Sequence, residues 1–336
     1  MEKETKSISY EGADQVGKGD AVSNLAEHFS QLGLEVEVIQ FPYYATPIGY
    51  LVRDMLLNNF PEGLDIDDDR EMDIRLALFS LNRLEILNCI EALDIPDVYI
   101  FDRGPYSCSL TIAYEMLERG IESEEYIRNA LGKGIQFDSY FLNFLNIDNC
   151  VVCLKHSGID WKASRGAGED MYEKISVQKL SEKVYSLIEE RVGEGWINVV
   201  TKNSRGWKSR EEICNKVISF IHKRGFDIPK GGKKRRGPNY LGIDGVREDM
   251  YIGSVVDDKL KSRWDLAIRS NNKKEVYVLG KDISEALVKT TELIKWNDEG
   301  LSFFFKDILE ELPEICYIIE NRYGKNILNK LVKSLK

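Results

Sequence analysis

One stretch near the N-terminus, Gly12–Asp20 (GADQVGKGD), limits what this chain can fold into more than any other. It follows an apolar segment that alternates as a strand does, Ser7–Glu11, and leads into a helical pattern, Ala21–Leu32. Glycines let backbone N–H groups turn inward around a phosphate, and the N-terminus of the helix adds the positive end of its dipole there. The sequence therefore predicts a phosphate-binding loop between a strand and a helix. The alternative is a glycine-rich turn with a chance lysine.

The loop carries most of the ligands expected for ATP. Lys18 can reach the β- and γ-phosphates. The hydroxyl residue that usually follows this lysine and helps to hold magnesium is replaced by Gly19, with Asp20 beside it. A carboxylate next to phosphate needs a cation between them, so Asp20 is either a ligand of Mg²⁺ or a first-turn residue that points away along the helix. The predicted ATP phosphate-binding residues are Gly12, Gln15, Val16, Gly17, Lys18, Gly19 and Asp20.

Strands and helices alternate over residues 1–224. The predicted strands are Ser7–Glu11, Glu35–Gln40, Val98–Phe101, Cys150–Leu154 and Trp196–Val200. The predicted helices are Ala21–Leu32, Arg70–Leu93, Ser107–Arg119, Glu124–Leu131, Ile175–Arg191 and Arg210–Arg224. This order implies right-handed crossovers and an α/β fold, with a mainly parallel sheet flanked by helices. Ligands of such sheets bind at the carboxyl ends of the strands, which is where the loop lies.

A second candidate feature ends the third predicted strand, where Asp102 and Arg103 stand side by side before Gly104. A carboxylate and a guanidinium at the carboxyl end of a strand can hold an acceptor hydroxyl or metal and a phosphate, respectively. Asp102 is accordingly a second candidate ligand of Mg²⁺. The alternative is a solvated ion pair that caps the next helix.

Five motifs, in chain order, resemble the thymidylate kinases, a family of P-loop nucleoside monophosphate kinases. They are YEGADQVGKG at 10–19, FPYYATPIG at 41–49, LFSLNRLE at 78–85, FDRGPYS at 101–107 and SRGAGEDMYE at 164–173. The resemblance covers about residues 7–224. It implies a P-loop kinase fold and the phosphorylation of dTMP, or of a related pyrimidine deoxynucleoside monophosphate, to the diphosphate. It also implies ATP and Mg²⁺ as cofactors and a homodimer formed through the kinase domain.

The resemblance further assigns roles to single residues. Asp14 would contact the acceptor sugar or the metal, Arg103 the acceptor phosphate, and Arg165, in a lid, the transferring phosphoryl group. Phe79 would stack on the base and Arg83 would bond its edge, which their spacing of four on one helix face allows. Tyr172 would pack beside the deoxyribose. The predicted catalytic residues are Lys18, Asp14, Asp102, Arg103 and Arg165, and the predicted acceptor-binding residues are Asp14, Phe41, Tyr44, Phe79, Arg83, Arg103 and Tyr172.

Departures from the family pattern, above all Asp20 and Tyr44, keep a second interpretation open. Tyr44 stands where the family usually has an arginine that contacts the acceptor phosphate, and Gly104 stands where it has a tyrosine. Gly19 gives the loop a Gly-Lys-Gly form that resembles adenylate kinases, in which magnesium is held mainly through water. The alternative is thus a nucleotide-binding or sensing protein whose degenerate kinase site is coupled to the C-terminal part.

Composition excludes several other classes. The formal charge of −10 argues against a general nucleic-acid-binding protein. No apolar run approaches the roughly 20 residues of a membrane span, and the charged start of the chain indicates no signal peptide. Six cysteines in 336 residues form no disulfide framework, so we expect a cytoplasmic protein.

The C-terminal part is separated by a change of charge and composition. Residues 225–336 carry a net charge of +3 and residues 1–224 a net charge of −13. The change falls at residues 225–238, a basic Gly/Pro-rich stretch typical of a linker. We therefore predict a kinase-like domain at 1–224 and an accessory α+β domain of unknown role at 239–336. Its strand-like runs are Tyr240–Val255 and Glu275–Gly280, and its helical runs are Asp282–Lys295, Leu301–Glu311 and Lys325–Leu335.

Overall fold

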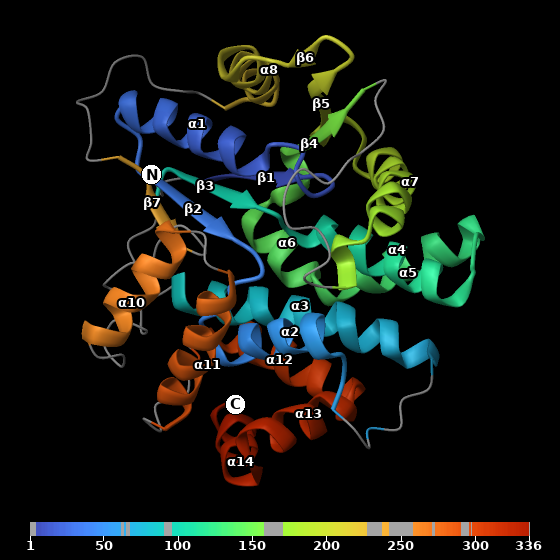
Figure 1. Cartoon of the computed structure of the whole chain (residues 1–336), viewed down its shortest axis with the longest axis vertical. Helices are drawn as coiled ribbons and strands as arrows, with labels where there is room; N and C mark the ends of the chain where they lie inside the picture. Colours follow the sequence, from blue (N-terminus) through green and yellow to red (C-terminus); the bar gives the residue numbers. More distant parts are fainter. Residues whose placement is uncertain are drawn as a thin grey trace. The chain divides into compact units, whose positions relative to one another are not determined.

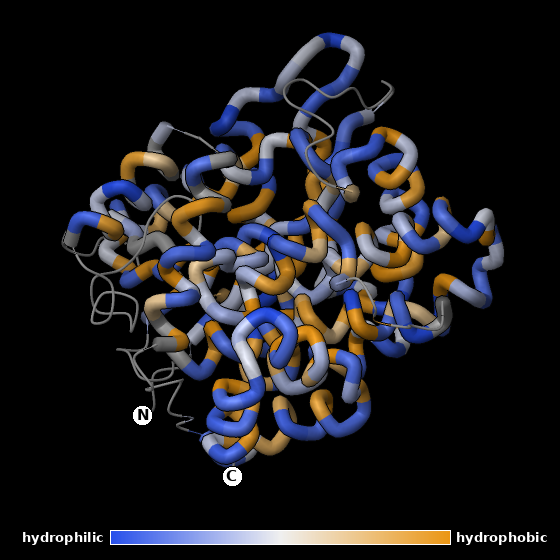
Figure 2. Tube along the Cα trace, turned by 60° about the horizontal axis from the view of Figure 1, so that its bottom comes forward, coloured by the Kyte–Doolittle hydropathy of each residue, from blue (hydrophilic) through white to orange (hydrophobic). Residues whose placement is uncertain are grey.

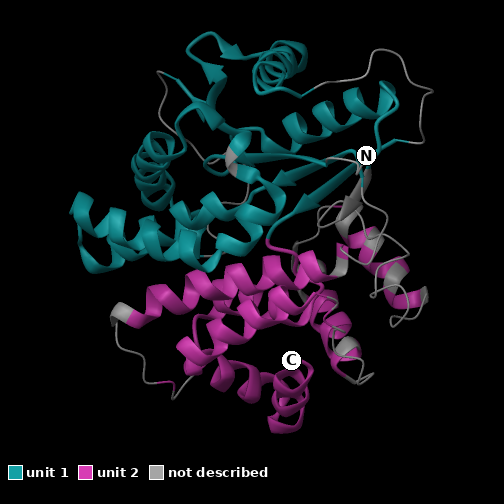
Figure 3. Ribbon diagram, turned by 180° about the vertical axis from the view of Figure 1, so that it is seen from behind, with its two compact units in different colours: residues 1–41, 96–239 teal, residues 42–95, 240–336 magenta. Residues whose placement is uncertain are grey.

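The computed structural model of the protein describes residues 5–61, 64, 68–90, 96–157, 171–226, 237–241, 258–270, 273–289, 296 and 298–335. The chain divides into two compact units, which Figure 3 shows in separate colours. Unit 1 consists of Met1–Phe41 and Pro96–Asn239, and unit 2 of Pro42–Ile95 and Tyr240–Lys336. None of the helices in the described ranges is long and apolar enough to span a membrane.

Unit 1 is built on a mainly parallel sheet with the strand order β6-β5-β4-β1-β3-β2-β7. The strands are β1 (Lys6–Glu11), β2 (Val36–Gln40), β3 (Val98–Asp102), β4 (Val151–His156), β5 (Trp196–Asn203), β6 (Gly206–Trp207) and β7 (Asn239–Leu241). Strand β1 pairs in parallel with β3 on one side and β4 on the other, whereas β6 pairs antiparallel to β5. Because the strand order reverses at β1, the loop after β1 lies at the switch point where such sheets bind ligands.

Helices cover the sheet of unit 1. They are α1 (Lys18–Gln31), α4 (Cys108–Arg119), α5 (Glu124–Phe137), α6 (Ser139–Leu145), α7 (Ile175–Val192) and α8 (Arg210–Lys223). Figure 1 shows α1 and α8 on one side of the strands and α4 to α7 on the other. Strands β1 and β3 are buried along nearly their whole length, as expected when both faces of a sheet are covered. The predicted α/β fold is confirmed, and so are the five strands predicted for residues 1–224.

Unit 2 is helical in its described residues, apart from the end of β7. Its helices are α2 (Pro47–Asn58), α3 (Asp68–Ile90), α10 (Asp258–Arg269), α11 (Lys273–Lys289), α12 (Glu299–Glu311), α13 (Pro313–Tyr323) and α14 (Lys325–Ser334). Helix α2 begins with two standard signals, because the side chain of Thr46 accepts a hydrogen bond from the Gly49 N–H (3.2 Å) and proline follows it. Figure 2 shows hydrophobic and hydrophilic residues alternating within single helices, the pattern of helices that bury one side.

Helix α3 is the exception to this one-sided pattern. It is buried through almost every turn from Met72 to Ile90, so it needs cover on several sides. Helix α2 packs against α3, while α12 and α13 supply further contacts to α3 from the C-terminal part, and α11 packs on α2. The side chain of Arg70 adds an ion pair to Glu314 on α13 (Nε–Oε1, 2.6 Å).

This packing differs from the domain division predicted from composition. Residues 42–95 belong to the same compact unit as residues 240–336, although the predicted boundary at 225–238 separates them. Most of that basic stretch, residues 227–236, lies outside the described residues. Whether residues 1–224 fold alone stays a prediction, but α3 would then lose the cover that α12 and α13 provide.

The secondary structure predicted for the C-terminal part needs correction. The strand predicted at Glu275–Gly280 is wrong, because these residues lie within α11. Alternating valines favour a strand locally, but Leu279 and Ile283, four residues apart, are both buried and define a helix face. Of the run Tyr240–Val255, only residues 240 and 241 are described, as part of β7. Helices α12 and α14 confirm the helices predicted at Leu301–Glu311 and Lys325–Leu335. The described part of the helix predicted at Asp282–Lys295 lies in α11. Helices α10 and α13 were not predicted.

Candidate active site

The side chain of Lys18 folds back onto the predicted phosphate loop. Its side chain is only 8% exposed, and its Nζ donates hydrogen bonds to the carbonyl oxygens of Gly12 (3.0 Å) and Ala13 (2.7 Å). Burial lowers the pKa of Lys18, and the nearby charges of Asp102 and Glu11 oppose that shift. The site thus places a partly desolvated ammonium group where a phosphate oxygen could replace the carbonyls.

Two residues near Lys18, one in the phosphate loop and one directly after β3, have rare backbone conformations. Gln15 and Arg103 have positive φ angles of 61° and 69°, in the left-handed region that non-glycine residues seldom occupy. Such residues persist where their surroundings fix them and are concentrated at functional sites. Part of the fixing is visible, because the buried hydroxyl of Thr201 on β5 donates a hydrogen bond to the Val16 carbonyl (2.7 Å).

Two of the predicted catalytic residues, Arg103 and Lys18, converge on the carboxylate of a third, Asp14. Arg103 forms an ion pair and hydrogen bond with its Oδ1, and Lys18 Nζ lies 4.0 Å from the same oxygen. Gln178 on α7, fully buried, donates to Asp14 Oδ2 (2.8 Å) and accepts from the Asp14 N–H (2.7 Å). The same Gln178 amide donates to the carbonyl of Tyr172 (2.7 Å), so one side chain ties the phosphate loop to the predicted deoxyribose contact.

Glu11 explains why glycine replaces the tyrosine of the family pattern. Its buried carboxylate accepts hydrogen bonds from the Gly104 N–H (2.9 Å), Ser9 Oγ (3.1 Å) and Ser107 Oγ (2.6 Å). Burial raises the pKa of Glu11, while the Ser107 hydrogen bond and the Arg103 charge oppose the rise. A Cβ on Gly104 would lie 2.5 Å from Ser9 Oγ and 3.2 Å from Glu11 Oε1. The carboxylate and the serine therefore leave no room for a side chain after Arg103.

The two candidate ligands of Mg²⁺ occupy different environments. Asp102 is buried at the carboxyl end of β3, close enough for its charge to raise the pKa of Lys18. Asp20 is 70% exposed and pairs with Arg210 at the start of α8 (2.8 Å). Among the described residues, no group of three or more His, Cys, Asp or Glu could hold a metal ion. Magnesium at phosphates needs only one or two carboxylates together with water and phosphate oxygens, so Asp102 fits it and Asp20 fits the helix-terminus role.

This geometry gives a prediction for Asp20. We expect Asp20→Ala to leave the magnesium concentration for half-maximal activity within about twofold of the parent value, because the carboxylate is paired with Arg210 on the surface. The measurement is a magnesium titration of phosphoryl transfer at saturating nucleotide, with Arg210→Ala as the matched control. A clear rightward shift for Asp20→Ala alone would return Asp20 to the metal site.

In unit 2, helix α3 presents the predicted base-binding pair. Within the described run 72–88, Phe79 alone is partly exposed, while Arg83, one turn further, is buried. Tyr44 is also partly exposed, and the guanidinium of Arg53 on α2 lies over its ring, 5.2 Å from the centroid. A positive charge thus lies next to the position where the family usually has an arginine.

Of the two remaining predicted residues, one lies in the hydrophobic core and the other lies outside the described residues. Phe41 lies in the core of unit 1, where its ring stacks on Phe101 (6.1 Å between centroids) and meets the edge of Phe141 (5.6 Å). Its burial gives a core role and no open face to a nucleotide. Arg165, predicted to lie in a lid, lies outside the described residues, as does most of the motif at 164–173.

Sequence reasoning missed Gln178, Thr201 and Trp207. The first two act through hydrogen bonds that only the tertiary structure brings about, although Thr201 is the one buried polar residue of its strand and could have been noticed for that reason. Trp207, on β6, is 54% exposed, and a Cβ on Gly17 would come within 3.4 Å of its indole ring. Lys202 lies over that indole (5.0 Å) and His156 meets its edge (5.3 Å). An open aromatic surface therefore lies directly beside the phosphate loop.

The parallel sheet, the loop at its switch point and the buried lysine together define a P-loop nucleotide-binding protein. The family model described as thymidylate kinase matches residues 10–204, and the chain belongs to the thymidylate kinase family. The expected family resemblance is thereby confirmed for the part of the chain before residue 205.

Two relatives, compared over most of their length, carry the name of this family. The thymidylate kinase of Dictyostelium discoideum is 29% identical over 218 residues, which cover 64% of this chain and 83% of that protein. The thymidylate kinase of Plasmodium falciparum (isolate 3D7) is 25% identical over 224 residues, covering 66% and 91%. A solved structure, the thymidylate kinase from Candida albicans, is 22% identical and covers 66% of this chain and 93% of its own, with a TM-score of 0.43.

Proposed function

We propose that the protein transfers the γ-phosphoryl group of ATP to dTMP, or to a closely related pyrimidine deoxynucleoside monophosphate, to give the diphosphate. One observation carries the proposal, namely the convergence of Lys18, Arg103 and Asp14 at the end of β1. Two cations and a carboxylate at the phosphate loop match the needs of phosphoryl transfer, which depends on positioning and on neutralising charge.

The roles follow from the chemistry of each group. Lys18 would exchange its carbonyl partners for β- and γ-phosphate oxygens and stabilise the charge that develops during transfer. Arg103 would bind the acceptor phosphate with its planar guanidinium, while Asp14 orients that guanidinium and contacts the acceptor sugar. Bound Mg²⁺ would neutralise the phosphate oxygens, with Asp102 holding it directly or through water. Arg165 is proposed as a further cation for the transferring group.

On the acceptor side, Phe79 would stack on the base and Arg83 would bond its edge. Arg53 would supply, beside Tyr44, the charge that the family places at the position of Tyr44. A planar guanidinium is the side-chain group best suited to bind a phosphate, which supports this role for Arg53.

The deciding experiment measures ADP release with dTMP, dUMP, dCMP, dGMP and dAMP as acceptors, ATP as donor and Mg²⁺ present. We expect turnover with dTMP at a kcat of at least about 1 s⁻¹, in the usual range of enzymes, and much weaker use of the purine acceptors. No turnover with any acceptor, together with tight nucleotide binding, would favour the alternative of a nucleotide sensor.

Trp207 gives a prediction for the donor nucleotide. Its exposed ring beside Gly17 can pack on the base or ribose of ATP, so Trp207→Ala should raise the KM for ATP about three- to thirtyfold, the range for losing one stacked aromatic contact. The KM for dTMP should change less than about twofold, and Trp207→Phe should recover most of the loss. Exposed Phe144 on α6, changed to alanine, is the matched control. Equal effects on both substrates would contradict a donor role.

The homodimer is proposed from the family alone, and the cytoplasmic location from the family and from the cysteine content of the sequence. Light scattering on the purified full chain reports the state directly.

A further inference from the structure

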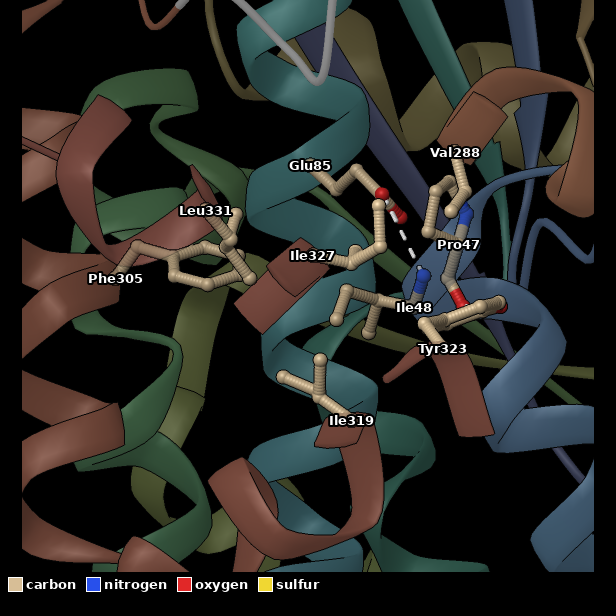
Figure 4. Close-up of a pocket in the computed structure, with 9 residues that line it drawn as sticks. All are labelled: Pro47, Ile48, Glu85, Val288, Phe305, Ile319, Tyr323, Ile327 and Leu331. Atoms are coloured by element: carbon tan, nitrogen blue, oxygen red, sulfur yellow. Dashed lines mark hydrogen bonds between the residues drawn. The ribbon is translucent and has the colours of Figure 1, made fainter. Parts of the chain in front are cut away.

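The C-terminal helices contact one functional segment of unit 2, Pro42–Gly49, which follows β2 and includes the first turn of α2 and which we call the acceptor loop. This inference rests on the proposed function, because the loop carries Tyr44. On one side α3 fixes the loop. Asn82 accepts from the Tyr43 N–H (2.9 Å) and donates to the Tyr43 carbonyl (3.2 Å), and Glu85 Oε1 accepts from the Ile48 N–H (3.4 Å). The dashed line in Figure 4 marks this last bond.

On the other side, residues more than 200 positions away hold the same loop. Tyr323, at the end of α13, donates its hydroxyl to the carbonyl of Pro47 (2.9 Å) and lies 3.3 Å from Ser284 Oγ on α11. Gly280 on α11 approaches so closely that a Cβ there would lie 3.3 Å from the Tyr44 carbonyl oxygen. Two helices of the C-terminal part therefore touch the backbone at both ends of residues 44–47.

A small hollow lies beside Pro47 and Ile48 and is bordered by Glu85 and Tyr323. Figure 4 shows the Tyr323 ring next to Pro47 and Ile48, with apolar side chains on the far side of the hollow. The hydroxyl of Tyr323 adds a hydrogen bond to this apolar packing. Removing the hydroxyl alone therefore tests the specific contact and leaves the packing of the ring in place.

We infer that α11 and α13 form a positioning element of the acceptor site, in which Tyr323 and Gly280 set the place of the Tyr44 segment. Neither residue needs to touch the nucleotide. The C-terminal helices would then tune the affinity for the acceptor monophosphate while leaving the donor side unchanged. This gives the part of the chain beyond the family match a role in the same reaction.

The first test is Tyr323→Phe in the full chain, which removes the hydroxyl and keeps the ring. We expect the KM for dTMP to rise about three- to tenfold, as for the loss of one neutral hydrogen bond, with kcat and the KM for ATP within about twofold of the parent. Tyr317→Phe on the same helix is the matched control, because Tyr317 is 42% exposed. A KM for dTMP unchanged in Tyr323→Phe would overturn the inference, as would equal rises in the KM of both substrates.

Gly280→Ala separates positioning from stability. Alanine is the better helix former, so the melting temperature should stay equal or rise, while its methyl group presses on the Tyr44 carbonyl and raises the KM for dTMP. A parallel loss of stability and dTMP affinity would instead indicate a structural role only. Should the parent chain bind dTMP without turnover, calorimetric Kd values for dTMP in the same variants test the inference independently of the proposed activity.

Discussion

Replacing Lys18 with alanine should lower kcat about 10²- to 10³-fold while the chain stays folded. The loss corresponds to removing one pre-positioned charge from the phosphoryl-transfer site. Folding should suffer little, because the ammonium is partly desolvated and its contacts, two carbonyl oxygens and the Asp14 carboxylate, all lie within the loop itself. The loss of those two hydrogen bonds lowers the free energy of unfolding by about 1–3 kcal/mol. The variant no longer buries a charged group, and this offsets part of the loss.

The measurement pairs turnover with the melting temperature. Lys216→Ala is the matched control, since Lys216 is an exposed lysine on α8. It should match the parent in both turnover and melting temperature. Near-normal turnover in a folded Lys18→Ala protein would remove the phosphate-loop assignment, whereas an unfolded variant would show that the lysine also supports the fold.

The kinase part was largely predictable because its signals are local. The strand, the glycine-rich loop and the helix follow one another within residues 6–31, and each apolar run sets its own strand or helix. Asp102 and Arg103 could be placed near the loop because the carboxyl ends of parallel strands share one edge of the sheet. The partners Gln178 and Thr201 could not be placed, because their contacts join residues 164 and 185 positions apart.

The division into two compact units could not be predicted from the sequence, for a related reason. Composition marks the change near residue 230, but it cannot show which earlier helix the C-terminal helices cover. Helix α3 itself gave only a weak signal, because its buried residues include charged and polar ones such as Arg75, Asn82 and Glu85, so the sequence shows no one-sided apolar stripe that would reveal its cover. Local signals for α2 and α13 were also present, because a proline stands at the first turn of both helices.

The backbone of the phosphate loop gives the largest expected effect on stability, at Gly12. Its φ of 128° is a conformation that other residues rarely adopt, and a Cβ there would overlap the carbonyl oxygen of Leu154 on β4. Because the obstacle is backbone in the centre of the sheet, neither side can move without disturbing the pairing of β1 with β4. We expect Gly12→Ala to cost about 3 kcal/mol or more and to lower the melting temperature by about 6–12 °C.

Gly19 provides the matched control for Gly12, because it lies in the first turn of α1 and no atom comes within 4 Å of a Cβ built there. Gly19→Ala should stabilise the chain by about 0.5–1 kcal/mol through helix propensity alone. Melting curves of both variants, recorded without nucleotide, measure these two changes in stability independently of any change in phosphate binding. If Gly12→Ala melted within about 2 °C of the parent, the loop could not lie against β4 as described. The placement of Lys18, which depends on that contact, would then be wrong as well.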